Sequence, residues 1–336
     1  MESASKSNPL YRVQICTSTT RYVVTQAVVS IEMSEQEKQL AASADINLMD
    51  VDVNGSKISS LISSRDRVYI FTNDGSRSEE VFRGYIWNIS HKENLTESAI
   101  TLKCYDNLIY WQESEHYEFF SSGKLTVDIL SLLGTRIGLN SVVYKYENII
   151  HGNLVLRGAI ADFVTEDLLN VVQKQVGKPY VLRSEVDRIV VREEGTNERV
   201  YTISKANNAT EVRRFISMNG VVTLVSIYGT APDDEKMPVE AVESGEFGTY
   251  GILRKIITRN EDTTLEQAKS EAQNIIKEKG KPKWEYDVKA TDIPWIRKGD
   301  GVRISCDTLE GAFIVKSISR EISNKGNIMT LTVVDY

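Results

Sequence analysis

Three glutamates that lie close together in the sequence are the best candidates for acid–base chemistry. Glu113, Glu115 and Glu118 could supply the two carboxyl groups that a glycosidase holds ~5–10 Å apart around a sugar bond. They lie in a polar stretch, however, where neighbouring carboxylates are normally solvated, and the sequence does not set their distance in space. We therefore expect no catalytic residues, and a cell-wall hydrolase acting through a Glu or Asp pair stays open as an alternative.

A second fragment matches the first half of a calcium-binding loop. Asp50, Asp52 and Asn54 offer oxygen ligands at alternating positions, and Gly55 stands where such a loop bends. The twelfth position, where a bidentate carboxylate is required, is Leu61. An Asn-Gly pair that follows a strand-like segment is also typical of a β-hairpin turn, so we favour a hairpin over a metal site.

The histidines and cysteines lack the partners that would make them reactive. No two histidines have the spacing of metal ligands or of a catalytic dyad, and the cysteines are far apart within apolar runs, which favours buried thiols over disulfides. The sequence has no His-Glu-x-x-His, Cys-x-x-Cys, Gly-x-Ser-x-Gly or phosphate-loop motif. We expect no enzyme activity and no cofactor. The residues concerned are His91, His116, His151, Cys16, Cys104 and Cys306.

The four tryptophans could stack on sugars or bases, but packing explains them better. Trp87 lies within a predicted strand and Trp284 starts another, so both are expected in a core or an interface. Trp295 lies in a predicted turn and is the best candidate for an exposed interface anchor. A carbohydrate-binding adhesion protein, which would expose such side chains, is the second alternative.

Composition argues against two kinds of partner. The 336 residues carry 40 Lys and Arg against 47 Asp and Glu, a formal charge of −7, and the basic residues form no segregated patch, so we expect no specific nucleic-acid binding. No window approaches the ~20 apolar residues of a membrane span, and the polar N-terminus lacks the apolar region of a signal peptide. We therefore expect a protein that is made and kept in a cytoplasm, or leaves it by lysis, with no membrane partner.

The most informative pattern is an internal repeat. Residues 66–106 and 300–335 both begin with Asp-x-Val, continue with a strand starting at Phe82 or Phe313, and end with Thr-Leu-x-x-x-Asp. With these two phenylalanines aligned, the second hairpin of the first copy is two residues longer. One chain that carries a three-stranded unit twice can present twice as many equivalent surfaces as there are subunits. This pattern indicates assembly rather than catalysis.

Local patterns predict a mixed, mainly β fold in three parts. Alternating strand patterns predict a first β-barrel domain over 1–111, completed by 198–230. Helical and strand patterns over 112–197 predict a small inserted α/β domain. Residues 231–336 are predicted to form a second β-barrel domain with one long helix packed across it.

Start and stop signals define both ends of the long predicted helix. Thr263 and Glu266 form a predicted capping box, and Gly280 marks the end of the apolar stripe. The acidic stretch 231–248 before it is predicted to be a long loop, either a solvated linker or a segment that faces a channel or partner.

The order of these motifs resembles that of the central baseplate hub proteins of contractile phage tails. The resemblance extends from about residue 60 to the end, and it includes hubs of PBSX-type defective prophages and R-type bacteriocins of Gram-positive bacteria. It is carried by strands, turns and helices: Phe82-x-Gly84, Cys104-Tyr105-Asp106, the helix from Leu125 to Ile137, Tyr250-Gly-Ile-Leu253, the long capped helix, Gly299-Asp-Gly-Val302, Gly311-Ala-Phe313 and Met329-Thr-Leu331.

The resemblance implies two tail-tube-like β-barrel modules per chain and a homotrimer that forms a pseudo-hexameric ring. It implies the tail tube protein, the central spike protein and other baseplate proteins as partners. The role it implies is structural: symmetry adaptation between tube and spike, and nucleation of the tube. The particle would be a phage tail or bacteriocin, assembled in the cytoplasm and released by lysis. Some relatives carry wall-degrading domains, and nothing in this sequence matches one.

The repeat also suggests where subunits meet. Edge strands and hairpins of 66–106 and 300–336 are expected to pair or pack between subunits. The candidate interface residues are Trp295, Phe313 and Phe82. A proline in the strand from Phe313 to Ile318 is expected to remove ladder donors and abolish particle assembly.

Overall fold

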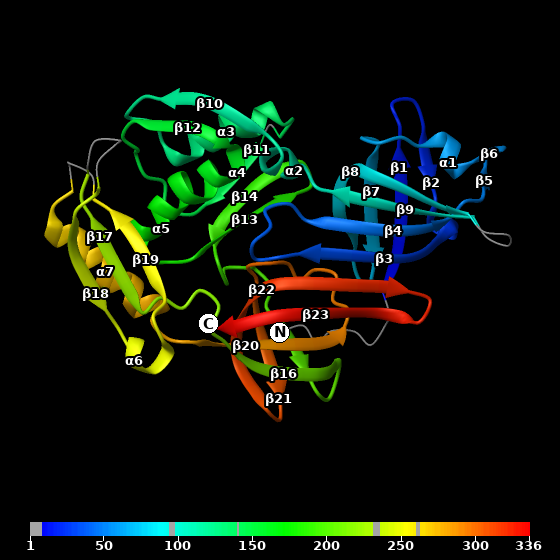
Figure 1. Cartoon of the computed structure of the whole chain (residues 1–336). Coiled ribbons are helices and arrows are strands. Elements are labelled where there is room, and N and C mark those ends of the chain that lie inside the picture. Colours follow the sequence, from blue (N-terminus) through cyan, green and yellow to red (C-terminus); the bar gives the residue numbers. More distant parts are fainter. Residues whose placement is uncertain (1–8, 94–97, 140, 231–235, 260–262) are drawn as a thin grey trace. The chain divides into compact units, whose positions relative to one another are not determined.

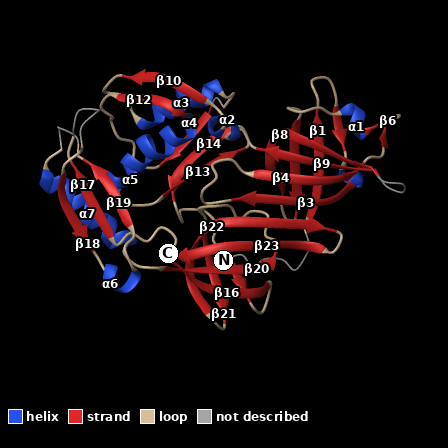
Figure 2. Ribbon diagram, viewed as in Figure 1, coloured by secondary structure: helices blue, strands red, loops and turns tan. Residues whose placement is uncertain are grey.

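The fold is mixed and mainly β, as the strand patterns predict (Figure 2). The computed structural model describes residues 9–93, 98–139, 141–230, 236–259 and 263–336. It divides into one unit of residues 1–213 with 286–336, and a second unit of residues 214–285. Most strands of the first unit belong to a 13-stranded sheet that contains two β-modules (Figure 1).

The first module is antiparallel. Its elements are β1 (Leu10–Cys16), β2 (Arg21–Val23), η1 (Thr25–Ala27), β3 (Val28–Glu35), β4 (Ser43–Met49), β5 (Asp52–Val53), β6 (Ser56–Lys57), α1 (Ile58–Leu61), β7 (Arg67–Asn73), β8 (Ser78–Glu93) and β9 (Ser98–Tyr105). The sheet order is β3-β4-β9-β8-β7-β1-β2, and alternate side chains such as Ile46, Ile70 and Leu102 fill one core. The β5–β6 hairpin turns at Asn54 and Gly55, both with positive φ, which confirms the hairpin interpretation of the calcium-like fragment.

The second module has the sheet order β16-β20-β23-β22-β21-β15 and its own core. Its strands are β15 (Tyr201–Ser204), β16 (Ala209–Ser217), β20 (Lys283–Thr291), β21 (Gly301–Cys306), β22 (Leu309–Ser323) and β23 (Gly326–Asp335). β15 pairs with β21 and buries Tyr201 and Ile203 in this core, and β16 pairs with β20. This corrects the expectation that 198–230 completes the first barrel, because these apolar side chains find their core in the second module.

Between the modules lies a segment that we call the insert, with a core of its own. Its elements are α2 (Ile109–Gln112), β10 (Glu115–Phe120), α3 (Thr126–Arg136), β11 (Ser141–Lys145), β12 (Leu154–Ala159), α4 (Ile160–Asp162), the π-helix η2 (Phe163–Leu169), α5 (Asn170–Val176), β13 (Tyr180–Glu185) and β14 (Arg188–Glu193). β10 pairs with β12, and β14 lies between β11 and β13. The helical run ends where Gly177 adopts a φ of 73°, the left-handed C-cap that glycine accommodates.

The second unit contains a three-stranded sheet covered by one helix. Its elements are β17 (Leu224–Tyr228), β18 (Val239–Ser244), α6 (Phe247–Tyr250), β19 (Arg254–Thr258) and α7 (Leu265–Lys279). Ala268 and Ala272 of α7 form a buried cluster with Val225 and Ile227 of β17. The long helix therefore packs on its own sheet, which corrects the expectation that it packs across the second barrel.

The structure corrects two further expectations about this unit. The capping box lies one residue later than expected, with Thr264 accepting the N–H of Gln267 and the Gln267 side chain accepting the N–H of Thr264. Of the stretch 231–248 expected to be a loop, 231–235 lies outside the described residues and 239–244 forms β18. β18 forms because its backbone pairs with β17, although half of its side chains are polar and none is fully buried.

Candidate assembly interface

The two modules contain the same three-stranded meander in the same register. The pairs of β8–β9 match those of β22–β23, and both ladders shift at one equivalent residue of the middle strand, Trp87 or Lys316. The pairs from Arg67–Tyr85 to Ile70–Phe82 match those of β21–β22, and beyond them the β7–β8 ladder has a further shift, at Val81, that β21–β22 lacks. This equivalence aligns Phe313 with Gly84 instead of Phe82, two residues from the alignment expected from sequence. The extra length of the first copy therefore lies between β7 and β8. A two-residue error keeps every side chain on its face of the sheet, which is why the pattern hid it.

The turn before each meander is also repeated. Arg65 and Gly299 take φ values of 73° and 81°, and each donates its N–H to the middle strand, at 2.7 and 2.8 Å. Asp66 and Asp300 follow, and a carboxylate oxygen of each accepts the backbone N–H three residues earlier, at 2.7 and 3.0 Å. Register, strand irregularity and turn coincide, so the modules are two copies of one structure.

The repeat extends beyond the three strands found in the sequence. The order β3-β4-β9-β8-β7 in the first module corresponds to β16-β20-β23-β22-β21 in the second. A short connection joins β3 to β4, whereas residues 218–282 separate β16 from β20. This long separation explains why the sequence pattern revealed only the three strands that follow it.

The strand β22 joins the two modules within the chain. Its first half pairs with β21, and residues 318–323 pair antiparallel with residues 30–35 of β3 (Figure 1). Its other edge pairs with β23 over residues 313–323. Ile318 of β22 and Ile31 of β3 are almost completely buried. One module-to-module contact is thus a continuous backbone ladder.

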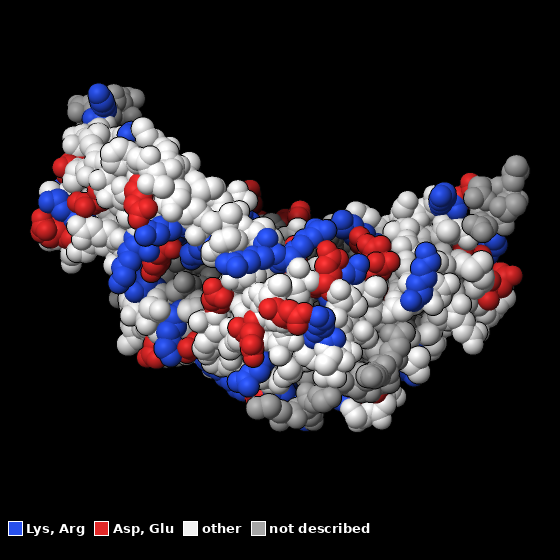
Figure 3. Space-filling model, turned by 90° about the horizontal axis from the view of Figure 1, so that it is seen from below, with Lys and Arg blue, Asp and Glu red and all other residues white. Residues whose placement is uncertain are grey.

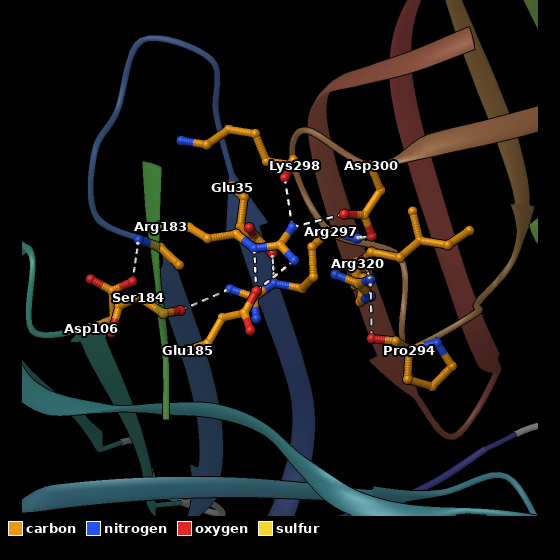
Figure 4. A network of polar contacts seen from close by, with 12 residues as sticks. Glu35, Asp106, Arg183, Ser184, Glu185, Pro294, Arg297, Lys298, Asp300 and Arg320 are labelled. Carbon is orange, nitrogen blue, oxygen red and sulfur yellow. Dashed lines mark hydrogen bonds and ion pairs between the residues drawn. The ribbon is translucent and has the colours of Figure 1, made fainter. Parts of the chain in front are cut away.

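Buried charges surround this junction (Figure 4). Arg320 of β22 pairs with Asp292 at 3.0 Å, with only 5% and 0% of the two side chains exposed. The Tyr11 hydroxyl of β1 donates to the other oxygen of Asp292, and burial together with this carboxylate raises the pKa of Tyr11 well above its usual value. Because removing one member would leave a buried charge uncompensated, this cluster holds β1, β22 and the 292 turn together.

A second group of charged residues links the β3–β4 connection to the turn from 297 to 300. Glu35 of β3 pairs with Arg297. Burial by itself would raise the pKa of Glu35, but the guanidinium groups of Arg297 and Arg183 lower it. Lys298 donates to two backbone carbonyls of the β3–β4 connection at 3.0 and 2.7 Å, and burial lowers its pKa. The turn from 297 to 300 is therefore fastened to the first module.

The insert is fastened to the same turn. Arg183 of β13 pairs with Asp300 at 2.9 Å and donates to the carbonyl of Lys298 at 2.7 Å. Arg192 of β14 pairs with the same Asp300 oxygen. Through these contacts the insert and both modules share one buried polar network, for which a structural role is sufficient.

A cavity of about 830 Å³ lies beside this network, with walls from both modules and the insert. Arginines and carboxylates alternate along it, and Arg83 pairs with Glu80 at 2.7 Å and with Asp187. Lys and Arg also lie beside Asp and Glu across the face shown in Figure 3. Such mixed, paired charge selects neither a polyanion nor a cation.

The three predicted interface residues occupy different positions from one another. Phe82 is 7% exposed in the first core, and Phe313 is 2% exposed in the second, edge-on to Tyr286. Trp295 is partly buried, and its Nε1 donates to Asp74 at 2.8 Å. All three contact their own chain, so their role between subunits remains a prediction. Sequence reasoning missed the buried ion pairs, and the matching Asp of the two Asp-x-Val motifs was the one signal pointing to Asp300.

The residues considered for chemistry are not brought together into one site. Glu118 pairs with Arg136 at 2.6 Å, and buried His151 hydrogen-bonds Thr126 at 2.8 Å. Burial lowers the pKa of His151. Within the described ranges, no group of three or more His, Cys, Asp or Glu side chains could hold a metal ion. Across the same ranges, no helix combines the length and apolarity needed to span a membrane.

The whole architecture is shared with tail proteins of known structure. The 43 kDa tail protein of prophage MuSo2 from Shewanella oneidensis is 14% identical, with a TM-score of 0.69 over 97% of this chain and 98% of that one. A tail protein from Neisseria meningitidis is also 14% identical, with a TM-score of 0.68 over 97% and 96%.

A type VI secretion component from Escherichia coli, described as structurally similar to the T4 bacteriophage tail proteins gp27 and gp5, is 12% identical. Its TM-score is 0.56 over 96% of this chain and 76% of that one. These identities show a common fold, which confirms the fold expected from the resemblance. No curated protein sequence matches the chain. The family model described as YQBQ-like matches residues 31–334, nearly the whole sequence, and the chain therefore belongs to the YQBQ-like family.

Proposed function

We propose that the protein is the structural baseplate hub of a contractile tail-like particle. Three chains would form a ring of six similar β-modules that accepts the tail tube on one side and the central spike on the other. The observation that carries this proposal is the duplication, because a chain with two copies of one module lets a three-fold assembly mate with a six-fold one. The ring would nucleate tube growth.

The stiffness of the junction supports a structural role. The two modules are joined by a backbone ladder and by buried ion pairs, so they would keep a fixed spacing around the ring axis. The similar Shewanella and Neisseria proteins are tail proteins, which supports a place in a tail. The other partners would be further baseplate proteins, in a phage tail or bacteriocin assembled in the cytoplasm and released by lysis.

Negative-stain electron microscopy of particles from the producing bacterium tests this proposal. Deletion of the gene is expected to abolish assembled tails while the tube and sheath proteins are still made, and a plasmid copy should restore them. Intact contractile particles that fail only to kill or adsorb would overturn the structural role. Peptidoglycan release or glycan binding by the purified chain would then distinguish a hydrolase from an adhesion protein.

A further inference from the structure

The junction inside the chain provides a template for a contact between chains. Along β22, residues 309–314 face β21 and residues 318–323 face β3, on the edge opposite β23. The strand thus extends beyond β21, so that the edge of its second half is available to the neighbouring module. In the second copy, β3 pairs with this edge.

The equivalent half-strand in the first module has no such partner. Residues 78–85 of β8 pair with β7, but on that edge residues 88–93 pair with no strand in the described part of the chain. Side chains from Asn88 to Glu93 are exposed, apart from Ile89, which is partly buried. Ile89 is equivalent to Ile318, which is completely buried in the core of the second module at the point where β22 pairs with β3. The first copy therefore has the donor side of the junction without its acceptor.

The acceptor side is free in the second module. β16 is the equivalent of β3, and it ends the 13-stranded sheet, so its edge opposite β20 pairs with no described strand. Thr210, Glu211 and Arg213 on it are exposed. A free strand edge presents unpaired N–H and C=O groups and is a template for pairing with another chain.

We propose that residues 89–93 of β8 in one protomer pair antiparallel with residues 209–213 of β16 in the next. This contact repeats the β22–β3 junction between chains. The two edges lie on different modules, so the contact is head-to-tail, and three copies close a ring in which internal and external junctions alternate. The inference rests on the proposed hub function and identifies the surfaces by which the trimer forms.

Disulfide trapping in assembled particles tests the pairing. Ser90→Cys is combined in turn with Thr210→Cys, Glu211→Cys, Val212→Cys and Arg213→Cys, because antiparallel neighbours approach within disulfide distance. Cys16 and Cys306, which are partly exposed, are changed to Ser, and fully buried Cys104 is kept. Ser76→Cys with Thr210→Cys is the matched control, since Ser76 is an exposed serine in the turn that precedes the other end of β8.

Oxidation is expected to give covalent dimers and a closed covalent trimer for one or two of the four pairs, at least tenfold above the control. Trimers in particles, established by native mass measurement, with no pair above the control would overturn this contact and leave the hub function standing. Particles that form normally without the protein, or that hold it as a monomer, would overturn both.

Discussion

The two copies of the meander share their backbone but bury different carboxylates. Asp66 and Asp300 occupy the same turn, yet Asp66 is partly exposed while Asp300 is 4% exposed between two arginines of the insert. At the ends of the last strands the order reverses, because Asp106 is 4% exposed and its equivalent Asp335 is exposed. The comparison teaches that backbone hydrogen bonds define the module, and that the segments covering each copy decide which charges become structural.

Proline substitutions at equivalent positions of the middle strands β8 and β22 should give the largest difference between the two copies. Ile318→Pro and Ser319→Pro lie where β22 is paired on both edges, so either one loses a ladder bond, and we expect loss of folded protein. Ile89→Pro and Ser90→Pro are the matched changes in β8. Successive N–H groups point to opposite edges, so one of these two should spare the β8–β9 hairpin, fold as a monomer and fail to assemble.

Circular dichroism of the purified variants and electron microscopy of particles give the two readouts. If the β8 variants and the β22 variants all lost their folded structure to the same extent, this result would contradict the view that β8 has a free edge. Normal particles from the Ile318→Pro or Ser319→Pro variants would count against the junction itself.

The buried pair at the junction should give the next largest effect. Arg320→Ala leaves Asp292 fully buried without its cation, and we expect a loss of about 3–5 kcal/mol in the free energy of unfolding. Urea unfolding measures it. Lys205→Ala, which breaks the exposed pair with Asp307, is the control and should leave the midpoint unchanged. Similar midpoints for both variants would show that the buried pair does not stabilise the junction.

The two repeated turns allow a direct comparison of environments. Asp300→Asn removes the negative charge between Arg183 and Arg192 and should cost about 2–4 kcal/mol. Asp66→Asn weakens only a turn hydrogen bond and should cost about 1 kcal/mol. The same urea experiment measures both. A larger loss at Asp66 would mean that the turn, and not the insert, determines the difference.

The smallest expected effect is a pH dependence from the end of β9. Burial raises the pKa of Asp106 to about 7, against the N–H groups of Ala42 and Leu108 that donate to it. Because the folded-state pKa lies above the unfolded value of about 4, this group's contribution to stability falls as pH rises from about 4 to 7.

Asp106→Asn should therefore reduce the change in melting temperature between pH 5 and pH 7.5 by a few degrees, as measured by calorimetry. Asp335→Asn, at the exposed equivalent, should leave the profile unchanged. An unaltered slope in the Asp106→Asn protein would exclude this carboxyl as its source.

Much of the fold could be predicted from local signals. Alternating side chains located the strands of both meanders, and Asn54-Gly55 located a hairpin. Where the prediction of the fold failed, the reason was that the sequence does not show which strands pair with each other. β15 and β16 have ordinary strand patterns, and nothing local tells that they pair with β21 and β20. The candidate site was predicted least, because most of its ion pairs join residues that are distant in the sequence, such as Arg183 and Asp300.

The sequence by itself determined the mainly β class, the existence of a repeat and the expectation of an assembly role, because each of these depends on patterns within one element or on likeness between two segments. Only the tertiary structure decided the true register of the repeat, the five-strand extent of the module and the β22–β3 junction. A strand carries the same period-two pattern whichever neighbour it pairs with, so register and partner are set by the backbone bonds and core that form only when distant segments meet.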